Sequence, residues 1–246
     1  MTSLTPRTRV LLGAALALVV LVVLGAVSLT GGSDAPSPAS AGAGAPAGAT
    51  LDASDVTDAT ARARLATARR DADDPLALGR VDAPVVVVEF GDFQCPFCRL
   101  FAQRDEPALL QRYVDSGQVR LEWRDYAYLG PESVTAAVAA RAAGRQGRFW
   151  PFHDALYAQQ RPENRGAVDD AFLTGIATGV GLDPARFAAD RADPALRAAV
   201  ESDLRTGTSL GVTGVPTFLV GDQLIFGAQP LGTFTGAIDA ALARAR

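Results

Sequence analysis

Hydrophobic positions divide the chain into an apolar N-terminal run, a segment of small residues and a domain with mixed strand and helix periodicity. Residues 10–29 carry no charge and match the length of about 20 residues that crosses a hydrocarbon core. Arg7 and Arg9 precede this run, so the positive-inside rule places the N-terminus in the cytoplasm. We expect a cytoplasmic segment over residues 1–9, a membrane anchor over residues 10–30 and an exported remainder. A cleaved signal peptide would export the same remainder.

The segment after the predicted anchor has few side chains that could bury a core. Residues 31–50 are almost entirely Ala, Gly, Ser and Pro, which is typical of a flexible tether. Residues 51–70 are compatible with a helix but only weakly amphipathic, so they fit either a first helix or more of the tether. We predict a flexible linker over residues 31–73 and a compact domain over residues 74–246.

The first half of the domain has the pattern of a strand, a helix and a second strand. Residues 85–88 are four consecutive valines, which is typical of a central strand buried on both faces. A helical apolar period follows from Pro96 to about Ser116, and Gly117 is suited to end that helix. Residues 119–126 alternate as a second strand, which completes a β–α–β unit.

The second half of the domain predicts a helical block, a hairpin and a last helix. Residues from about 131 to 206 are rich in Ala and Arg, with Gly or Pro at intervals, as in several consecutive helices. Residues 217–220 and 224–226 are short apolar runs around a turn. An amphipathic helix is expected from about Leu231 to the end. This order predicts an α/β fold with an inserted α-helical domain.

Composition restricts the chemistry that this domain can perform. The chain has 246 residues, with 23 Lys or Arg, 27 Asp or Glu, one His and two Cys. The net charge of −4 gives no general attraction to nucleic acid, so no nucleic-acid partner is expected. One His and two Cys cannot complete a structural zinc site or build a disulfide-rich scaffold. His153 is predicted to be a packed structural histidine, and Trp150 and Phe152 are predicted to be core aromatics.

The two cysteines, Cys95 and Cys98, stand in the sequence CPFC where the first strand passes into its helix. This spacing places their sulfur atoms within disulfide reach across the first helical turn. The free N–H groups and the positive end of the helix dipole favour a thiolate at Cys95, and a thiolate is the nucleophile in disulfide exchange. Cys98, one turn later, is expected to be more buried and to attack a mixed disulfide at Cys95. An inert structural disulfide or half of a zinc site would use the same residues.

Other positions bear on this site. Val215 and Pro216 come directly before an apolar strand, where proline is common; a cis proline there would present the backbone of Val215 to an extended substrate. Glu89 ends an apolar strand, where a carboxylate is costly unless it is paired. It fits either an unusual buried acid or a strand-end carboxylate that reaches solvent. Asp92 is expected to be a solvated turn residue.

In this chain CPFC follows VVVVEFGDFQ, and VPT precedes a late strand. With these two features the sequence resembles the thioredoxin superfamily. The segments FWPFHDALYAQQ (149–160) and SLGVTGVPTFLVGDQLIFGAQP (209–230) narrow the resemblance to the DsbA-like group, with a thioredoxin-like fold and an inserted α-helical domain. The resemblance covers the chain from about Pro75 to the end. The anchored architecture is similar to that of DsbA-like proteins from actinobacteria and other Gram-positive bacteria.

The resemblance implies a role for each site residue. Cys95 matches the nucleophilic cysteine and Cys98 the resolving one, so their disulfide would be the redox centre, with no separate cofactor and no metal. Pro216 matches the cis proline, and Val215 matches the residue whose backbone pairs with substrate. Glu89 matches a buried acid that helps to move protons near the active site.

The two residues between the cysteines, Pro96 and Phe97, are expected to contact substrate. The best-known oxidases of the group have Pro-His there, and that histidine stabilises the thiolate. Phe97 has neither a positive charge nor an N–H donor in its side chain, so the sequence does not set the oxidising strength.

The resulting hypothesis is a thiol–disulfide oxidoreductase held in the cell membrane by a single span, with its catalytic domain outside the cytoplasm. It would donate the Cys95–Cys98 disulfide to unfolded or thiol-bearing exported proteins. The resemblance implies a membrane redox partner of the DsbB or vitamin K epoxide reductase type. Two alternatives share these residues: a disulfide reductase, for example one serving cytochrome c maturation, and a non-catalytic binding module. The intact CPFC and VPT sequences argue against the binding module.

Overall fold

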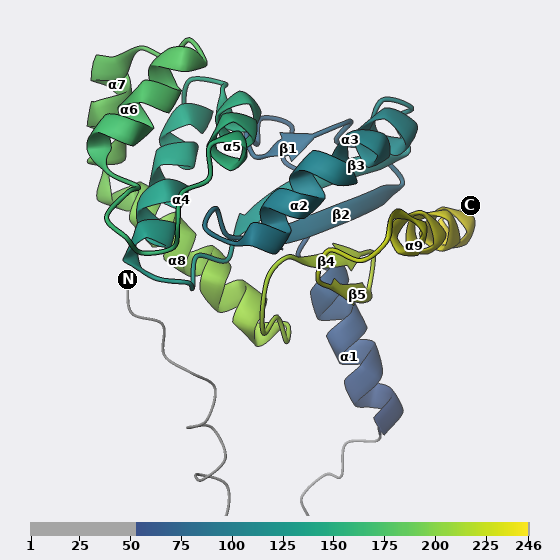
Figure 1. The fold of residues 1–246 in the computed structure, drawn as a ribbon. Coiled ribbons are helices and arrows are strands. Elements are labelled where there is room, and N and C mark those ends of the chain that lie inside the picture. The colour runs from purple at the N-terminus through teal and green to yellow at the C-terminus, as the bar shows by residue number, and fades with distance from the viewer. Residues whose placement is uncertain (1–52, 246) are drawn as a thin grey trace, which may run out of the picture. The chain divides into compact units, whose positions relative to one another are not determined.

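The computed structural model describes residues 53–245, which build a mixed sheet with helices on both faces (Figure 1). Within this part of the chain the sheet has five strands in the order β1–β3–β2–β4–β5. β2 and β3 are parallel, as the β–α–β pattern predicted, and the other neighbouring strands are antiparallel. The strands are β1 (Ala77–Leu78), β2 (Val85–Gly91), β3 (Val119–Asp125), β4 (Thr217–Val220) and β5 (Gln223–Phe226).

The central strand β2 is buried along its whole length, which confirms the interpretation of the four valines. Successive side chains of a strand point to opposite faces. Val85 and Val87 accordingly belong to one apolar cluster, whereas Val86 and Val88 belong to another on the opposite face. Glu89 continues the first series and therefore faces the same side of the sheet as Val87.

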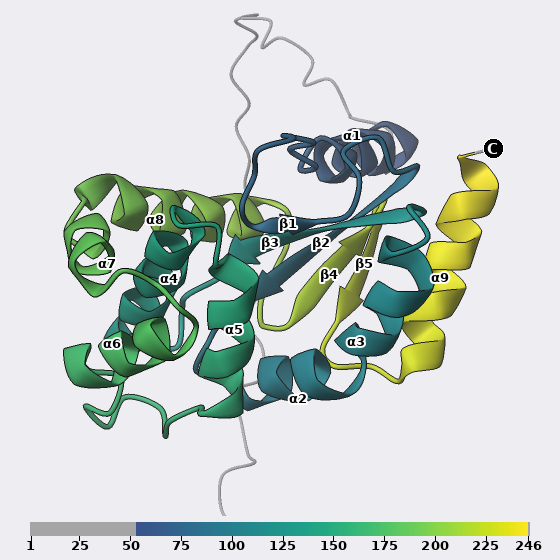
Figure 2. The ribbon, with the colours of Figure 1, turned by 90° about the horizontal axis from the view of Figure 1, so that it is seen from above.

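The first face of the sheet is covered by the helices after β2 together with the last helix (Figure 2). These elements are α2 (Pro96–Arg104), α3 (Glu106–Leu109), the π-helical stretch η1 (Leu110–Val114) and α9 (Leu231–Arg244). The single helix predicted from residue 96 to about 116 is therefore divided. The division falls at Pro107, which cannot donate a backbone hydrogen bond and crowds the preceding turn.

The predicted helical insertion is present and extends slightly beyond residue 206. It comprises α4 (Pro131–Gly144), α5 (Phe149–Ala158), α6 (Asp170–Gly179), α7 (Pro184–Arg191) and α8 (Pro194–Ser209). The end of α8 lies against the second face of the sheet. A Cβ atom at Gly207 would come within 3.0 Å of the Phe90 ring, so glycine permits this close approach.

The ordered domain begins before residue 74. Residues 53–65 form α1 (Ala53–Leu65), and near its end the Arg64 guanidinium donates to the Asp222 carbonyl oxygen at 3.3 Å. The flexible linker predicted over residues 31–73 therefore does not include residues 53–73, where the alternative of a first helix is present. Residues 31–52 of that linker lie outside the described residues. Residues 51–70 are only weakly amphipathic because polar contacts, and not an apolar face, hold this segment to the domain.

The segment after α1 is fixed to the sheet by the buried carboxylate of Glu122 on β3. The backbone N–H groups of Arg69 and Arg70 donate to it at 2.9 and 3.0 Å. On the other side, the guanidinium groups of Arg120 and Arg124 donate to it at 2.9 and 2.7 Å. Both carboxylate oxygens are thereby used, which offsets the cost of burying the charge.

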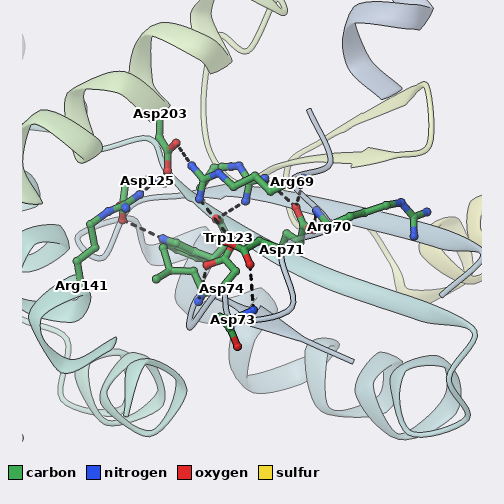
Figure 3. A network of polar contacts seen from close by, with 12 residues as sticks. Arg69, Arg70, Asp71, Asp73, Asp74, Trp123, Asp125, Arg141 and Asp203 are labelled. Carbon is green, nitrogen blue, oxygen red and sulfur yellow. Dashed lines mark hydrogen bonds and ion pairs between the residues drawn. The ribbon is translucent and has the colours of Figure 1, made fainter. Parts of the chain in front are cut away.

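A second carboxylate, Asp203 of α8, extends this polar network into the insertion (Figure 3). It pairs with Arg69 of the N-terminal segment and with Arg141 of α4. Arg141 also pairs with Asp125 of β3, which accepts a hydrogen bond from the Trp123 indole at 2.9 Å. The network therefore joins the N-terminal segment, the sheet and the helical insertion.

No helix among residues 53–245 is long and apolar enough to cross a membrane. The predicted cytoplasmic segment over residues 1–9 and the predicted anchor over residues 10–30 lie outside the described residues.

Candidate active site

Cys95 is the N-cap of α2, directly after the turn that leaves β2. Its backbone is extended, with φ −72° and ψ 120°, and its Sγ atom accepts the N–H of Cys98 at 3.4 Å. Pro96 occupies the first helical turn, where its missing N–H costs no hydrogen bond. The turn thus places one sulfur at the positive end of a helix and the other one turn further along.

The two sulfur atoms have different environments. Cys95 is 4% exposed and Cys98 is fully buried, and both are free thiols. A hydrogen bond from the Cys98 thiol lowers the pKa of Cys95, and the backbone N–H groups of Cys98 and Phe97 reinforce this against the effect of burial. Burial raises the pKa of Cys98 well above its usual value. Cys95 is therefore the sulfur that ionises, whereas Cys98 keeps its proton.

The loop that enters β4 reaches the same place from the other half of the chain. The Val215–Pro216 peptide bond is cis, which is the form considered from the sequence. Cys95 Sγ donates to the Val215 carbonyl oxygen at 3.4 Å, although 120 residues separate them. Pro216 is buried and Val215 is half-buried. The structure therefore brings together the four residues Cys95, Cys98, Val215 and Pro216.

Exposed apolar side chains, here called the apolar rim, lie on α2 and on the loop after β3. Pro96 is exposed, and the side chains of Phe97 and Leu100 on α2 are 60% and 40% exposed. Tyr128, in the loop after β3, is 47% exposed, and its hydroxyl lies 3.8 Å from where a Cβ atom on Gly214 would be. Leu100 and Tyr128 were missed from the sequence. Leu100 could have been found from its spacing of three residues from Phe97, whereas Tyr128 has no local signal.

Glu89 is fully buried beneath this site. Both of its carboxylate oxygens lack a hydrogen-bond partner among the described residues. Burial raises its pKa to about 8, and the negative charge of Cys95 adds to the rise. The alternative of a solvent-reaching carboxylate is wrong, because β2 continues two residues further to Gly91 and places Glu89 inside the sheet.

Asp92 shapes the turn between β2 and α2. The expectation of a solvated residue is wrong, since Asp92 is only 1% exposed. Its Oδ1 atom accepts the N–H of Gln94 at 2.9 Å. Its Oδ2 atom accepts the N–H groups of Tyr128 and Leu129 at 3.1 and 3.2 Å. The carboxylate therefore ties the active-site turn to the loop that carries Tyr128.

A further polar cluster lies beside the site, between α3 and α5. One side-chain oxygen each of Glu106 and Asp154 and one ring nitrogen of His153 lie within 4.8 Å of one another. His153 is fully buried, as predicted, and its ring packs edge-on against Trp123 at 5.1 Å. Glu106 is 3% exposed. It was missed from the sequence, although an acid beside Pro107 within an apolar helical stretch was a usable signal.

Comparison with known sequences shows which proteins this chain is similar to. Residues 71–240 match the family model described as thioredoxin. The chain is 32% identical over 152 residues to the probable disulfide bond formation protein D of Bacillus anthracis, covering 60% of this chain and 70% of that protein. It is also 35% identical over 178 residues to the Na(+)/H(+) antiporter NhaA 1 of Salinispora arenicola. That match covers 72% of this chain but only 26% of the antiporter.

Solved structures show the same architecture. BdbD from Bacillus subtilis, in its oxidised form, superposes with a TM-score of 0.64 at 26% identity, covering 70% of this chain and 94% of BdbD. A thioredoxin-like oxidoreductase from Silicibacter pomeroyi DSS-3 superposes with a TM-score of 0.61 at 32% identity, covering 73% of this chain and 96% of that chain. Nearly the whole of each solved chain therefore has a counterpart here.

Proposed function

The chain belongs to the thioredoxin family, in its DsbA-like group, and on this premise we propose that it is an extracytoplasmic oxidase of protein thiols. It donates a Cys95–Cys98 disulfide to thiol-bearing exported proteins. The observation that carries the proposal is the pairing of a Cys95 whose pKa is lowered with a Cys98 whose pKa is raised, at one helix N-terminus. The similarity to disulfide bond formation proteins of Bacillus supports the oxidising direction.

The reaction consists of two exchanges. A substrate thiolate attacks Cys95 Sγ, so a substrate–Cys95 disulfide forms, the Cys95–Cys98 bond breaks, and its electron pair stays on Cys98. Because its pKa is high, Cys98 then takes up a proton. A second substrate thiolate attacks the substrate half of the mixed disulfide, and Cys95 leaves as a thiolate. The lowered pKa of Cys95 makes it the better leaving group.

The surroundings of Cys95 suit an extended, partly apolar peptide. The backbone of Val215 lies beside the sulfur, where it can pair with a substrate strand whose cysteine is bonded to Cys95. Phe97, Leu100 and Tyr128 offer exposed apolar surface around that strand. Unfolded exported proteins expose the apolar side chains that such a rim binds.

Repeated turnover needs an electron acceptor for the reduced enzyme. The partner we propose is a quinone-linked membrane protein of the DsbB or vitamin K epoxide reductase type. The uncharged run over residues 10–30, preceded by two arginines, supports a single-pass anchor with the domain outside the cytoplasm. Such an anchor would keep the domain close to its membrane partner.

Cysteine variants test the assignment of the two sulfurs. Cys95→Ser is expected to abolish oxidation of a dithiol peptide, because no nucleophile or leaving group remains at that position. Cys98→Ser, given oxidised glutathione, is expected to stop at a glutathione–Cys95 disulfide, visible by mass spectrometry, because the Cys98 thiol that would resolve it is absent. Retained oxidation by Cys95→Ser would refute the proposed role of Cys95.

The direction of electron flow is tested by the reduction potential of the cysteine pair at equilibrium with glutathione. We expect a value well above about −200 mV, as for an oxidase. A value near the roughly −270 mV of thioredoxin would identify the protein as a reductase with the same fold and overturn the oxidase proposal.

A further inference from the structure

Buried polar atoms without hydrogen-bond partners occur together on β2, α3 and α5. The described residues contain eight such side-chain atoms, and five of them belong to four neighbouring residues. The five are Glu89 Oε1 and Oε2, Glu106 Oε2, Trp150 Nε1 and His153 Nε2. Nearly all buried polar groups in folded proteins have a partner, so a concentration of exceptions calls for an explanation.

The backbone places these groups in one layer. Glu89 faces the α2 side of the sheet and stands opposite Trp123 in the register of β2 and β3. The His153 ring packs edge-on against Trp123 at 5.1 Å, and the Trp150 ring lies 5.1 Å from His153. The indole of Trp123 is therefore the shared neighbour of Glu89 and His153.

The cluster reaches the surface through Asp154. The ligating atoms of Glu106, His153 and Asp154 lie within 4.8 Å of one another, and His153 Nδ1 is 2.8 Å from Asp154 Oδ1. The Asp154 side chain is 71% exposed, whereas His153 is fully buried. A continuous series of polar groups thus connects the buried acid Glu106 to solvent.

There is also room for water next to Glu106. A cavity of about 20 Å³ is lined by Glu106 and by apolar side chains that include Val87 and Phe218. About 10–15 Å³ is enough for one water molecule. Val87 precedes Glu89 on the same face of β2, and Phe218 is the register partner of Glu89 on β4. The cavity therefore lies beside the strand positions that surround Glu89.

Both buried acids can carry a proton at neutral pH. Burial raises the pKa of Glu89 to about 8. Burial also raises the pKa of Glu106 to about 8; His153 opposes this rise, and Glu89 and Asp154 add to it. The two carboxyl groups are therefore close enough for the charge of Glu89 to raise the pKa of Glu106.

We propose that Glu106, His153 and Asp154 form a proton path that connects Glu89, and through it Cys98, with solvent on the α5 side of the domain. This inference rests on the proposed thiol–disulfide exchange. When the Cys95–Cys98 bond breaks, Cys98 keeps the electron pair of that bond. It then takes a proton from Glu89. Glu106 then returns a proton to Glu89 and is itself recharged from solvent through His153 and Asp154. Reoxidation drives the same protons in the opposite direction.

The path can be tested by following the reduced protein as it reacts with oxidised glutathione. Cys95 first attacks the glutathione disulfide, and the rate of this step depends on glutathione concentration. Cys98 must then lose its proton to resolve the mixed disulfide, and this second step is independent of that concentration. Tryptophan fluorescence in a stopped-flow instrument, with acid quenching and mass spectrometry, separates the two steps.

Glu106→Gln is expected to leave the first step unchanged and to slow the second at least tenfold, because the amide cannot carry the proton. Asp154→Asn, an exposed change, is expected to slow the second step less. Asp115→Asn, an exposed acid after the same helical segment, is the matched control and should leave both steps unchanged.

Glu106→Asp separates a proton path from a packing role. Aspartate keeps the carboxyl group but fills less space, whereas glutamine keeps the size but loses the carboxyl group. The proposal requires Glu106→Asp to resolve the mixed disulfide faster than Glu106→Gln. The reverse order, equal slowing of both steps, or wild-type resolution by Glu106→Gln would overturn it. Failure of the wild-type protein to form any mixed disulfide would instead refute the proposed function itself.

Discussion

At the scale of single residues, the site works by giving two chemically identical side chains opposite preferences. Cys95 and Cys98 are three residues apart, yet one accepts backbone N–H groups at a helix start and the other is enclosed by apolar side chains. The difference between their pKa values determines that Cys95 is the nucleophile and Cys98 the resolving cysteine. Of the two residues between them, the exposed Phe97 is therefore the simplest place to adjust these pKa values.

Phe97→His is expected to make the protein a stronger oxidant. Phe97 is 60% exposed, so the substitution disturbs little packing, and an imidazole N–H beside Cys95 would stabilise the thiolate of the reduced form. We expect a lower Cys95 pKa by thiolate absorbance and a higher reduction potential, with about 30 mV for each tenfold change in the glutathione equilibrium. Phe97→Leu, which adds no donor, should leave both quantities near the wild-type values.

Glu89 should make folding stability depend on pH. Its pKa in the folded protein is about 8, against an ordinary value of 4.5, so the folded state binds the proton more tightly. Its stabilising contribution is complete below about pH 4.5 and is lost as pH rises through 8, at up to about 1.4 kcal/mol per pH unit. Glu89→Gln should therefore be more stable than wild type at pH 8 but not at pH 5.

Urea unfolding of the reduced protein at the two pH values measures this effect. Glu201→Gln, an exposed change on α8, is the control and should keep the wild-type pH dependence. An equal loss of stability between pH 5 and 8 in Glu89→Gln and in wild type would show that Glu89 does not retain its proton in the folded state.

At the scale of elements, the indole of Trp123 on β3 packs directly against Gly91 at the end of β2. A Cβ atom at Gly91 would lie 2.1 Å from Trp123 Cη2, so only glycine fits between the strand and the indole. Trp123 in turn supports His153 and is held by Asp125. The position of the turn that carries Cys95 therefore depends on a glycine that contributes no chemistry of its own.

Gly91→Ala is expected to destabilise the protein by about 1–3 kcal/mol, because the added methyl group forces Trp123 out of its place. Gly175→Ala on α6 is the matched control. It places the same methyl group in open space within a helix and should be neutral or stabilising by up to about 1 kcal/mol. Equal urea midpoints for Gly91→Ala and wild type would mean that the indole can move aside without cost.

At the scale of the whole molecule, Glu122 and Asp203 join parts of the chain that are far apart in sequence. Burial alone would raise the pKa of Glu122, but the N–H of Arg69 and the guanidinium of Arg124 outweigh it and hold the pKa at about 2. The stabilisation from Glu122 is therefore complete above about pH 4.5 and is lost as pH falls through 2.

Glu122→Gln should cost about 3–5 kcal/mol at pH 7, because it leaves buried guanidinium groups without their counter-charge. The difference from wild type should narrow as pH falls toward 2. Asp82→Asn breaks the exposed pair with Arg80, which solvent screens, and should leave the urea midpoint close to that of wild type. A Glu122→Gln protein that unfolds at the same urea concentration as Asp82→Asn would contradict the importance of the network.

Local sequence patterns were sufficient for the features that depend on neighbouring residues. The four valines of β2, the helix that starts at Pro96 and the hairpin after Thr217 each follow from a short periodic run. The features that were wrong or missed depend on distant partners. Asp92 is buried because backbone groups of residues 128 and 129 reach it, and the fixed N-terminal segment depends on Glu122, more than fifty residues away.

The attachment of the N-terminal segment to Glu122 has a mechanical consequence. If the chain is tethered at its N-terminus, a pulling force that has passed α1 and its contact with Asp222 reaches the sheet at residues 69 and 70. There it passes into β3, the parallel neighbour of the strand that leads to Cys95. The force is then shared by several hydrogen bonds of the Glu122 carboxylate, which must break together. Tension on the tether would consequently be resisted close to the reactive sulfur instead of at the periphery.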